Sequence, residues 1–189
     1  MERFAFFVDA GYVLECGARI LKQPGRAQIR CNYKGLTEDL QGRIEEYSAG
    51  TLRKLRLYWY DAAVDAIPDA EQQAIAKLAH VKLRLGRLVN KRQKGVDALI
   101  MRDLMTLARE RAMVVAYLVS GDEDLREGVM AVQDMGVQVV LVGFDGPGQA
   151  QTLINEADEH MVFPDSFWQT FFTVRSQPGE TSERSRVSS

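Results

Sequence analysis

Short apolar runs alternate with helical patterns along most of the chain, and this alternation restricts the possible folds more than any other feature of the sequence. The runs predicted to form strands are residues 4–8, 55–60, 82–89, 113–119, 137–142 and 160–163. The run 113–119 is almost entirely apolar, which is typical of a central parallel strand covered on both faces. The alternation predicts an α/β fold, a three-layer α/β/α sandwich around a mainly parallel, Rossmann-like central sheet.

The segments between these runs have helical spacing or the composition of turns. Helices are predicted over residues 11–21, 36–47, 69–79, 96–111, 124–135, 152–157 and 165–173. The clearest is 96–111, in which Ile100, Leu104 and Ala108 share one face, and Thr37 is the predicted N-cap of 36–47. Residues 23–34, around a Pro-Gly pair, are expected to form an irregular connection.

Length and composition indicate one ordinary globular domain. The chain has 189 residues, with 46% hydrophobic and 26% charged. Residues 1–175 are predicted to form the domain. Residues 176–189, rich in Ser, Arg and Glu, are predicted to form a disordered tail. No apolar run approaches the roughly 20 residues that span a bilayer, and no signal-peptide pattern is present. We therefore expect a cytoplasmic protein with no membrane partner.

Two cysteines and two well-separated histidines give no disulfide framework and no Cys/His zinc pattern. The formal net charge of −2 does not by itself indicate nucleic-acid binding. However, residues 19–34 contain five basic and no acidic residues, and residues 82–94 contain six basic and no acidic ones. These stretches predict either a locally basic binding surface or ordinary solvated charge.

Acidic residues follow the predicted strands at the ends where ligands usually bind. Asp9 closes the run 4–8, and Asp122 with Asp124 follows the run 113–119. In a parallel sheet these positions meet at one edge, beyond the carboxyl ends of the strands. Asp97 lies on the apolar stripe of the helix 96–111, where an unpaired carboxylate is costly. A shared divalent cation would remove that cost, because Mg²⁺ takes oxygen ligands.

Each of these residues also has a purely structural interpretation. Asp9 could cap the helix that follows it, and Asp97 could be a first-turn acid favoured by the helix dipole. Ser120 and Glu123 fit a capping box. A nucleotide-binding or phosphotransfer domain is less compatible with the sequence, which has no Walker A motif, no G-x-G-x-x-G and no Asp-x-Asp at residue 9.

Three blocks carry a resemblance to a known family. They are Phe-Val-Asp-Ala-Gly-Tyr at 7–12, Lys-Gly-Val-Asp-Ala-Leu-Ile-Met-Arg-Asp-Leu at 94–104, and Leu-Val-Ser-Gly-Asp-Glu-Asp-Leu at 118–125. In order and spacing they resemble the blocks of NYN domains, a branch of the PIN-like nucleases, and the resemblance covers roughly residues 4 to 165. The Ser-Gly-Asp-x-Asp block is the most specific of the three.

The resemblance implies a metal-dependent ribonuclease that uses Mg²⁺ or Mn²⁺ and acts on RNA. By position, it implies that Asp9, Asp97, Asp122 and Asp124 are the catalytic, metal-binding acids, and that Ser120 orients a carboxylate or a metal-bound water. One position differs, because many members have Asn where this chain has Tyr12. A non-catalytic domain that binds RNA or protein for regulation is therefore the alternative.

Basic and aromatic residues complete the expected site. Lys91, Arg92 and Lys94 immediately precede the helix that carries Asp97, so we expect them to contact RNA phosphates. Tyr12 is expected either to stack on a base or to pack in the core. The aromatic residues Phe167, Trp168, Phe171 and Phe172 are expected to pack on the core, with a dimer face, and hence a homo-oligomer, as the alternative.

Overall fold

A seven-stranded sheet forms the centre of the molecule. The structure is a computed structural model that describes residues 2–89 and 92–175 of the chain. The strand order is β5-β4-β3-β1-β6-β7-β8. The strands are β1 (Glu2–Asp9), β3 (Leu52–Ala63), β4 (Val81–Val89), β5 (Arg92–Lys94), β6 (Val115–Val119), β7 (Gln138–Phe144) and β8 (Glu159–Phe163). All neighbouring pairs are parallel except β4–β5, which is antiparallel. The predicted α/β class with a mainly parallel sheet is confirmed.

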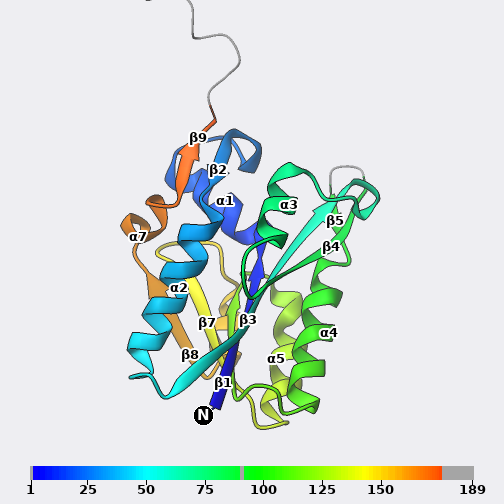
Figure 1. The fold of residues 1–189 in the computed structure, drawn as a ribbon, viewed down its shortest axis with the longest axis vertical. Helices are drawn as coiled ribbons and strands as arrows, with labels where there is room; N and C mark the ends of the chain where they lie inside the picture. The colour runs from blue at the N-terminus through cyan, green and yellow to red at the C-terminus, as the bar shows by residue number, and fades with distance from the viewer. Residues whose placement is uncertain (1, 90–91, 176–189) are drawn as a thin grey trace, which may run out of the picture.

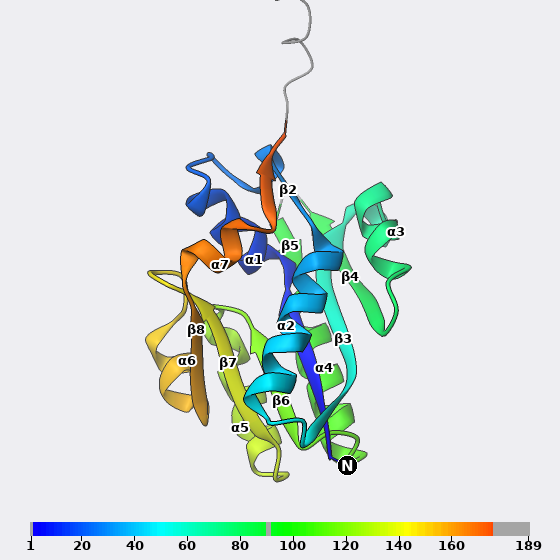
Figure 2. The ribbon, with the colours of Figure 1, turned by 60° about the vertical axis from the view of Figure 1, so that its left-hand side comes forward.

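Helices cover both faces of the sheet, as Figures 1 and 2 show for α2 on one side and α4 with α5 on the other. The helices are α1 (Ala10–Ile20), α2 (Tyr33–Tyr47), α3 (Ala70–Ala76), α4 (Val96–Arg109), α5 (Arg126–Gln133), α6 (Gln151–Glu156) and α7 (Asp165–Gln169). Side chains of β1 alternate between the two layers, because successive residues of a strand face opposite sides. Phe4 and Phe6 pack with α1 and α2, whereas Ala5 and Phe7 pack with α4 and α5.

The segment 23–34 departs from the predicted irregular connection. It contains a 3-10 turn, η1 (Arg26–Gln28), and a short strand, β2 (Ile29–Cys31). β2 pairs antiparallel with β9 (Phe172–Val174) in a separate two-stranded sheet. The predicted last helix over 165–173 is correspondingly too long, because α7 ends at Gln169 and the chain then extends into β9.

The start of α2 also differs from the prediction. The helix begins at Tyr33, and its N-cap is Asn32, whose Oδ1 accepts a hydrogen bond of 3.0 Å from the Gly35 N–H. Thr37 is therefore not the N-cap. It lies inside the helix, where its hydroxyl donates to the Lys34 carbonyl at 2.9 Å. The Asn32 side chain serves the cap better because it lies three residues before a backbone N–H that has no partner within the helix.

The C-terminal aromatic residues pack in the core, as predicted. Phe167, Trp168, Phe171 and Phe172 are all buried against the layer that contains α1 and α2. Trp168 stacks on Phe144 at a ring-centroid distance of 3.8 Å. Residues 176–189, predicted to be a disordered tail, lie outside the described residues, so the domain boundary at 175 stays a prediction.

Candidate active site

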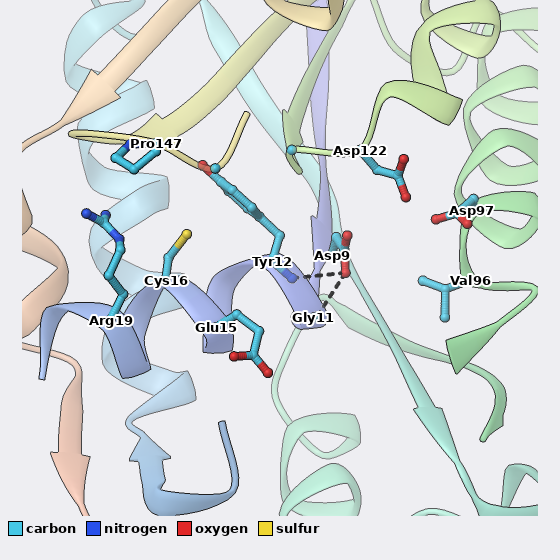
Figure 3. A pocket seen from close by; sticks show the side chains of 12 residues that line it. Asp9, Gly11, Tyr12, Glu15, Cys16, Arg19, Val96, Asp97, Asp122 and Pro147 are labelled. Carbon is cyan, nitrogen blue, oxygen red and sulfur yellow. Dashed lines mark hydrogen bonds between the residues drawn. The ribbon is translucent and has the colours of Figure 1, made fainter. Parts of the chain in front are cut away.

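A cavity of about 550 Å³ opens beyond the carboxyl ends of β1 and β6. Carboxylates from three separate segments line it: Asp9 at the end of β1, Asp97 in the first turn of α4, and Asp122 after β6. Figure 3 shows these acids together at one end of the cavity, with Tyr12 between them and Arg19. The other lining residues are Gly11, Glu15, Cys16, Val96, Gly121, Pro147 and Gly148.

Asp9 is held firmly by hydrogen bonds from both neighbouring segments. Its Oδ1 accepts from the backbone N–H groups of Gly11 at 2.8 Å and Tyr12 at 3.4 Å, so it caps α1. Its Oδ2 accepts from the Ser120 hydroxyl at 3.1 Å. The pKa of Asp9 is raised, chiefly by burial and also by the negative charge of Asp97, although these hydrogen bonds lower it. Asp9 therefore caps α1 and at the same time lines the cavity, whereas its role as a metal-binding acid stays a prediction.

Ser120 connects Asp9 to the loop that carries Asp122. It is fully buried after β6, and its Oγ also accepts from the Asp122 N–H at 3.3 Å. The alternative in which Ser120 and Glu123 form a capping box is wrong. Asp122 is the N-cap of the following 3-10 turn, η3 (Glu123–Leu125), and its Oδ1 accepts from the Asp124 N–H at 3.0 Å.

Asp97 faces the same cavity from α4 and is partly buried. Burial raises its pKa, and the negative charges of Asp122 and Asp124 raise it further. Asp124 itself is exposed and does not line the cavity, although its charge acts on Asp97. The structure thus brings Asp9, Asp97 and Asp122 to one cavity and places Asp124 beside it.

The donor set suits a hard divalent cation. Among the described residues, none of these three carboxylates forms an ion pair with Lys or Arg, so their mutual repulsion is not offset by a basic side chain. In the described part of the chain, no three His, Cys, Asp or Glu side chains are close enough together to enclose an ion. Mg²⁺ does not require such a cage, because it binds through one or two carboxylates and keeps several waters. The residues present therefore fit the ion by their chemistry.

Tyr12 both packs in the core and lines the cavity. Its hydroxyl oxygen accepts from the Phe144 N–H at 3.4 Å, and its ring meets the Phe144 ring edge-on at 5.5 Å. Burial raises the pKa of Tyr12, so its hydroxyl is neutral at physiological pH. Gly121 and Gly148 pack closely against it, because a Cβ on either would lie 3.0 to 3.4 Å from its ring.

Three further lining residues were not singled out from the sequence. Glu15, Cys16 and Arg19 follow Tyr12 at intervals of three, four and seven residues, which places them on one face of α1. This spacing is the signal that finds them once Tyr12 is placed at the site. Arg19 donates to the Asp145 carbonyl at 3.1 Å and thereby connects α1 to the loop after β7. Burial raises the pKa of the Cys16 thiol to about 11, so it is a poor nucleophile.

The basic residues predicted to contact RNA are only partly described. Lys94 is exposed and immediately precedes the glycine before α4. Lys91 and the side chain of Arg92 lie outside the described residues. In the described part of the chain, none of the helices is both long and apolar enough to cross a bilayer.

The fold and the site together define a Rossmann-like α/β domain with an acidic cavity at the carboxyl edge of its sheet. Residues 5–165 match the family model described as the NYN domain. The chain therefore belongs to the NYN domain family, a family of inferred nucleases, and the resemblance noted from its three sequence blocks is confirmed.

Two similar proteins have no assigned function. The uncharacterized protein y4oD of Sinorhizobium fredii is 43% identical over 118 residues, and the alignment covers 60% of this chain and 55% of that protein. The match thus spans little more than half the length of this curated relative. A protein of unknown function from Vibrio parahaemolyticus, known from a crystal structure, is 19% identical in sequence to this chain. The two structures match with a TM-score of 0.58 over 91% of this chain and 96% of that one. At this identity the likeness shows the fold alone.

Proposed function

We propose that this NYN domain is a divalent-metal-dependent ribonuclease that hydrolyses phosphodiester bonds in RNA. One observation carries the proposal: Asp9, Asp97 and Asp122 come from three distant segments and line one cavity. Burial raises the pKa of Asp9 and of Asp97, and so does the charge of a neighbouring carboxylate. Such an arrangement costs stability in a merely structural site and is typical of a cation-binding one.

In this proposal Asp9, Asp97 and Asp122 hold Mg²⁺ or Mn²⁺, directly or through waters that the ion keeps, and Asp124 is a further candidate. When bound, the ion stabilises negative charge on the phosphodiester and lowers the pKa of a bound water. The chain's own contribution is to fix the ligands in place. Ser120 donates to one oxygen of Asp9 while two backbone N–H groups hold the other, so Asp9 has little freedom to rotate.

RNA is the proposed substrate because basic residues lie close in sequence to Asp97, one of the acids that line the cavity. Lys91, Arg92 and Lys94 immediately precede the helix that carries Asp97, and we propose that they contact the phosphates. Contacts of this kind position the nucleic acid without reading its sequence, and they weaken as the salt concentration rises.

The first test is cleavage of a labelled mixed-sequence RNA with Mg²⁺, with Mn²⁺ and with a chelator. We expect cleavage that needs the metal and that falls at least about 100-fold in Asp122→Asn, because a metal ion contributes several kcal/mol to transition-state stabilisation. Asp134→Asn is the matched control, since Asp134 is an exposed acid at the end of α5. Full metal-dependent activity in Asp122→Asn would place the reaction elsewhere.

The second candidate function is a non-catalytic domain that binds RNA or protein. Tyr12 favours it, because this bulky residue occupies a position where many members have Asn and its hydroxyl is engaged by Phe144. This alternative predicts salt-sensitive RNA binding without cleavage, and no effect of Mg²⁺ on the melting temperature.

A further inference from the structure

A cluster of arginines surrounds one buried carboxylate on the α4 side of the sheet. Asp103 in α4 is only 6% exposed. Its Oδ2 accepts from Arg84 Nε at 2.8 Å and from the Tyr60 hydroxyl at 3.2 Å. Its Oδ1 accepts from Arg102 Nε at 3.1 Å and Nη2 at 3.0 Å. One carboxylate thus fixes two guanidinium groups, one on β4 and one on α4.

A third guanidinium adjoins this pair across an aromatic ring. The guanidinium carbons of Arg84 and Arg56 lie 5.4 Å and 5.8 Å from the centroid of the Tyr58 ring. Burial and the charge of Asp103 raise the pKa of Tyr60 well above its ordinary value, so Tyr60 adds no negative charge. The cluster of Arg56, Arg84 and Arg102 thus joins three guanidinium groups, two of which contact the Asp103 carboxylate while the third contacts the Tyr58 ring.

The cluster keeps donors directed away from Asp103. Arg84 uses only Nε on Asp103, and Arg102 leaves Nη1 without a partner among the described residues. The Arg84 and Arg102 side chains are 34% and 55% exposed. A guanidinium already held in place loses little entropy when it binds an oxyanion, and its planar donors match a phosphate.

The position of the cluster relates it to the carboxylate cavity. Asp103 lies six residues after Asp97 in the same helix, a rise of about 9 Å. On the sheet, Arg84 is paired with Tyr60, and Tyr60 is paired with Asp9. β5 pairs with β4 only at residues 87–89, so among the described strands β4 is the sheet edge at Arg84.

We propose that Arg56, Arg84 and Arg102 form a phosphate-binding subsite for the RNA backbone on one side of the scissile bond. The proposal rests on the proposed ribonuclease function and adds a second contact area to it. Lys82, which is exposed two residues before Arg84 on the same face of β4, extends the positive surface. The competing explanation is an internal ion cluster that also keeps the open sheet edge from pairing with other chains.

The test compares Arg102→Gln with Arg109→Gln, which removes the same charge from an exposed position near the end of the same helix. Arg102→Gln is expected to fold, because Asp103 keeps its hydrogen bonds from Arg84 and Tyr60. A thermal melting curve checks that the variant is folded. Both changes are made in full-length Asp122→Asn protein. Binding of labelled single-stranded RNA is measured by anisotropy over a range of salt concentrations, with a short RNA and with a longer RNA that extends it on both sides.

We expect Arg102→Gln to weaken binding of the longer RNA about fivefold and to reduce the slope of log K against log salt by about 1, with Arg109→Gln unchanged. The affinity for the short RNA should be the same in the Arg102→Gln and Arg109→Gln proteins. A folded Arg102→Gln protein that matches Arg109→Gln in affinity and slope overturns the subsite and leaves the ribonuclease proposal intact. No RNA binding by the Asp122→Asn parent overturns both proposals.

Discussion

Asp97 shows how the proposed site lowers the stability of the free protein. Its pKa is raised by burial and by the charges of Asp122 and Asp124. A carboxyl group whose pKa is raised by folding contributes stability below its ordinary pKa of about 4. That contribution is lost as the pH rises through the higher folded pKa. At neutral pH the ionised Asp97 is therefore unfavourable, even though the first turn of a helix normally favours an acid.

We predict that Asp97→Asn raises the stability of the metal-free protein at pH 7. The gain should be less than about 1 kcal/mol, because Asp97 is partly exposed and solvent screens its charge. Near pH 3, where the wild-type carboxyl is protonated, the difference should disappear. The measurement is thermal unfolding at both pH values with chelator and with Mg²⁺, and Mg²⁺ should stabilise the wild type more than the variant. A variant less stable than wild type at pH 7 in chelator would contradict the assignment.

At the level of single residues, the sequence predicted the positions of the acids better than their surroundings. Asp9, Asp97 and Asp122 were placed at one edge because the strand ends and the helix start are readable from apolar periodicity. The cluster of Arg56, Arg84 and Arg102 was not predicted, since it depends on β3, β4 and α4 coming together in the fold. The hydrogen bond from Ser120 to Asp9 spans 111 residues, so no local sequence pattern predicts it. Only the family resemblance implied that Ser120 orients a carboxylate, and it did not say which one.

Among the structural elements, the glycine-bearing turn after β6 sets how closely the next loop approaches. A Cβ on Gly121 would overlap the carbonyl oxygen of Gly148 and press on the Tyr12 ring. The Gly121 carbonyl also accepts from the Ala150 N–H at 3.0 Å. The loop after β7 therefore forms one wall of the cavity only because residue 121 lacks a side chain.

We predict that Gly121→Ala costs about 1–3 kcal/mol of stability, because the new methyl group forces the backbone apart. RNA cleavage should fall as the cavity wall moves. Chemical denaturation and the cleavage assay measure the two effects. Gly42→Ala is the control: Gly42 lies within α2 with no atom within 4 Å of the added Cβ, so that change should slightly increase stability. Equal stability of the two variants would show that the loop adapts freely.

The elements predicted correctly are those with a local signal. β6 and β7 are apolar runs, and α4 has a clear apolar stripe. β2 and β9 have three residues each and pair only with each other, so neither has a periodicity that could be recognised alone. β3 is longer than the predicted 55–60. The prediction stopped short because most residues at the two ends of the strand are polar or small, although they continue the pairing with β1 and β4.

In the whole molecule, β2 and β9 hold the segment 23–34 beside α1. Figure 1 shows this small sheet at the end of the molecule toward which β3 points. Phe172 in β9 fills the space next to Gly17, where a Cβ would lie 2.8 Å from its ring. Arg175 then pairs with Glu71 at 2.7 Å and donates to the Ile29 carbonyl at 2.7 Å. β9 and the residue that follows it therefore connect α3, β2 and α1.

We predict that Phe172→Ala lowers the free energy of unfolding by about 3 kcal/mol through the cavity it leaves. It should also speed proteolysis within residues 23–34, because their pairing partner loses its anchor. Denaturant unfolding and limited proteolysis with mass spectrometry measure these effects. Val174→Ala, a half-exposed position of the same strand, should change neither appreciably. Equal protease sensitivity in the two variants would mean that β9 does not hold the segment.

The pairing of β2 with β9 has a consequence for the order of events during translation. Ile29 and Arg175 are 146 residues apart, so the segment near the start of the chain leaves the ribosome long before its partner is made. A pair of distant residues cannot form until both have been made, and non-local pairing is slow because loop-closure entropy opposes it. The 23–34 segment therefore reaches its final place only when β9 has been synthesised, and the end of the molecule that carries the β2–β9 sheet is the last part of the domain to be completed.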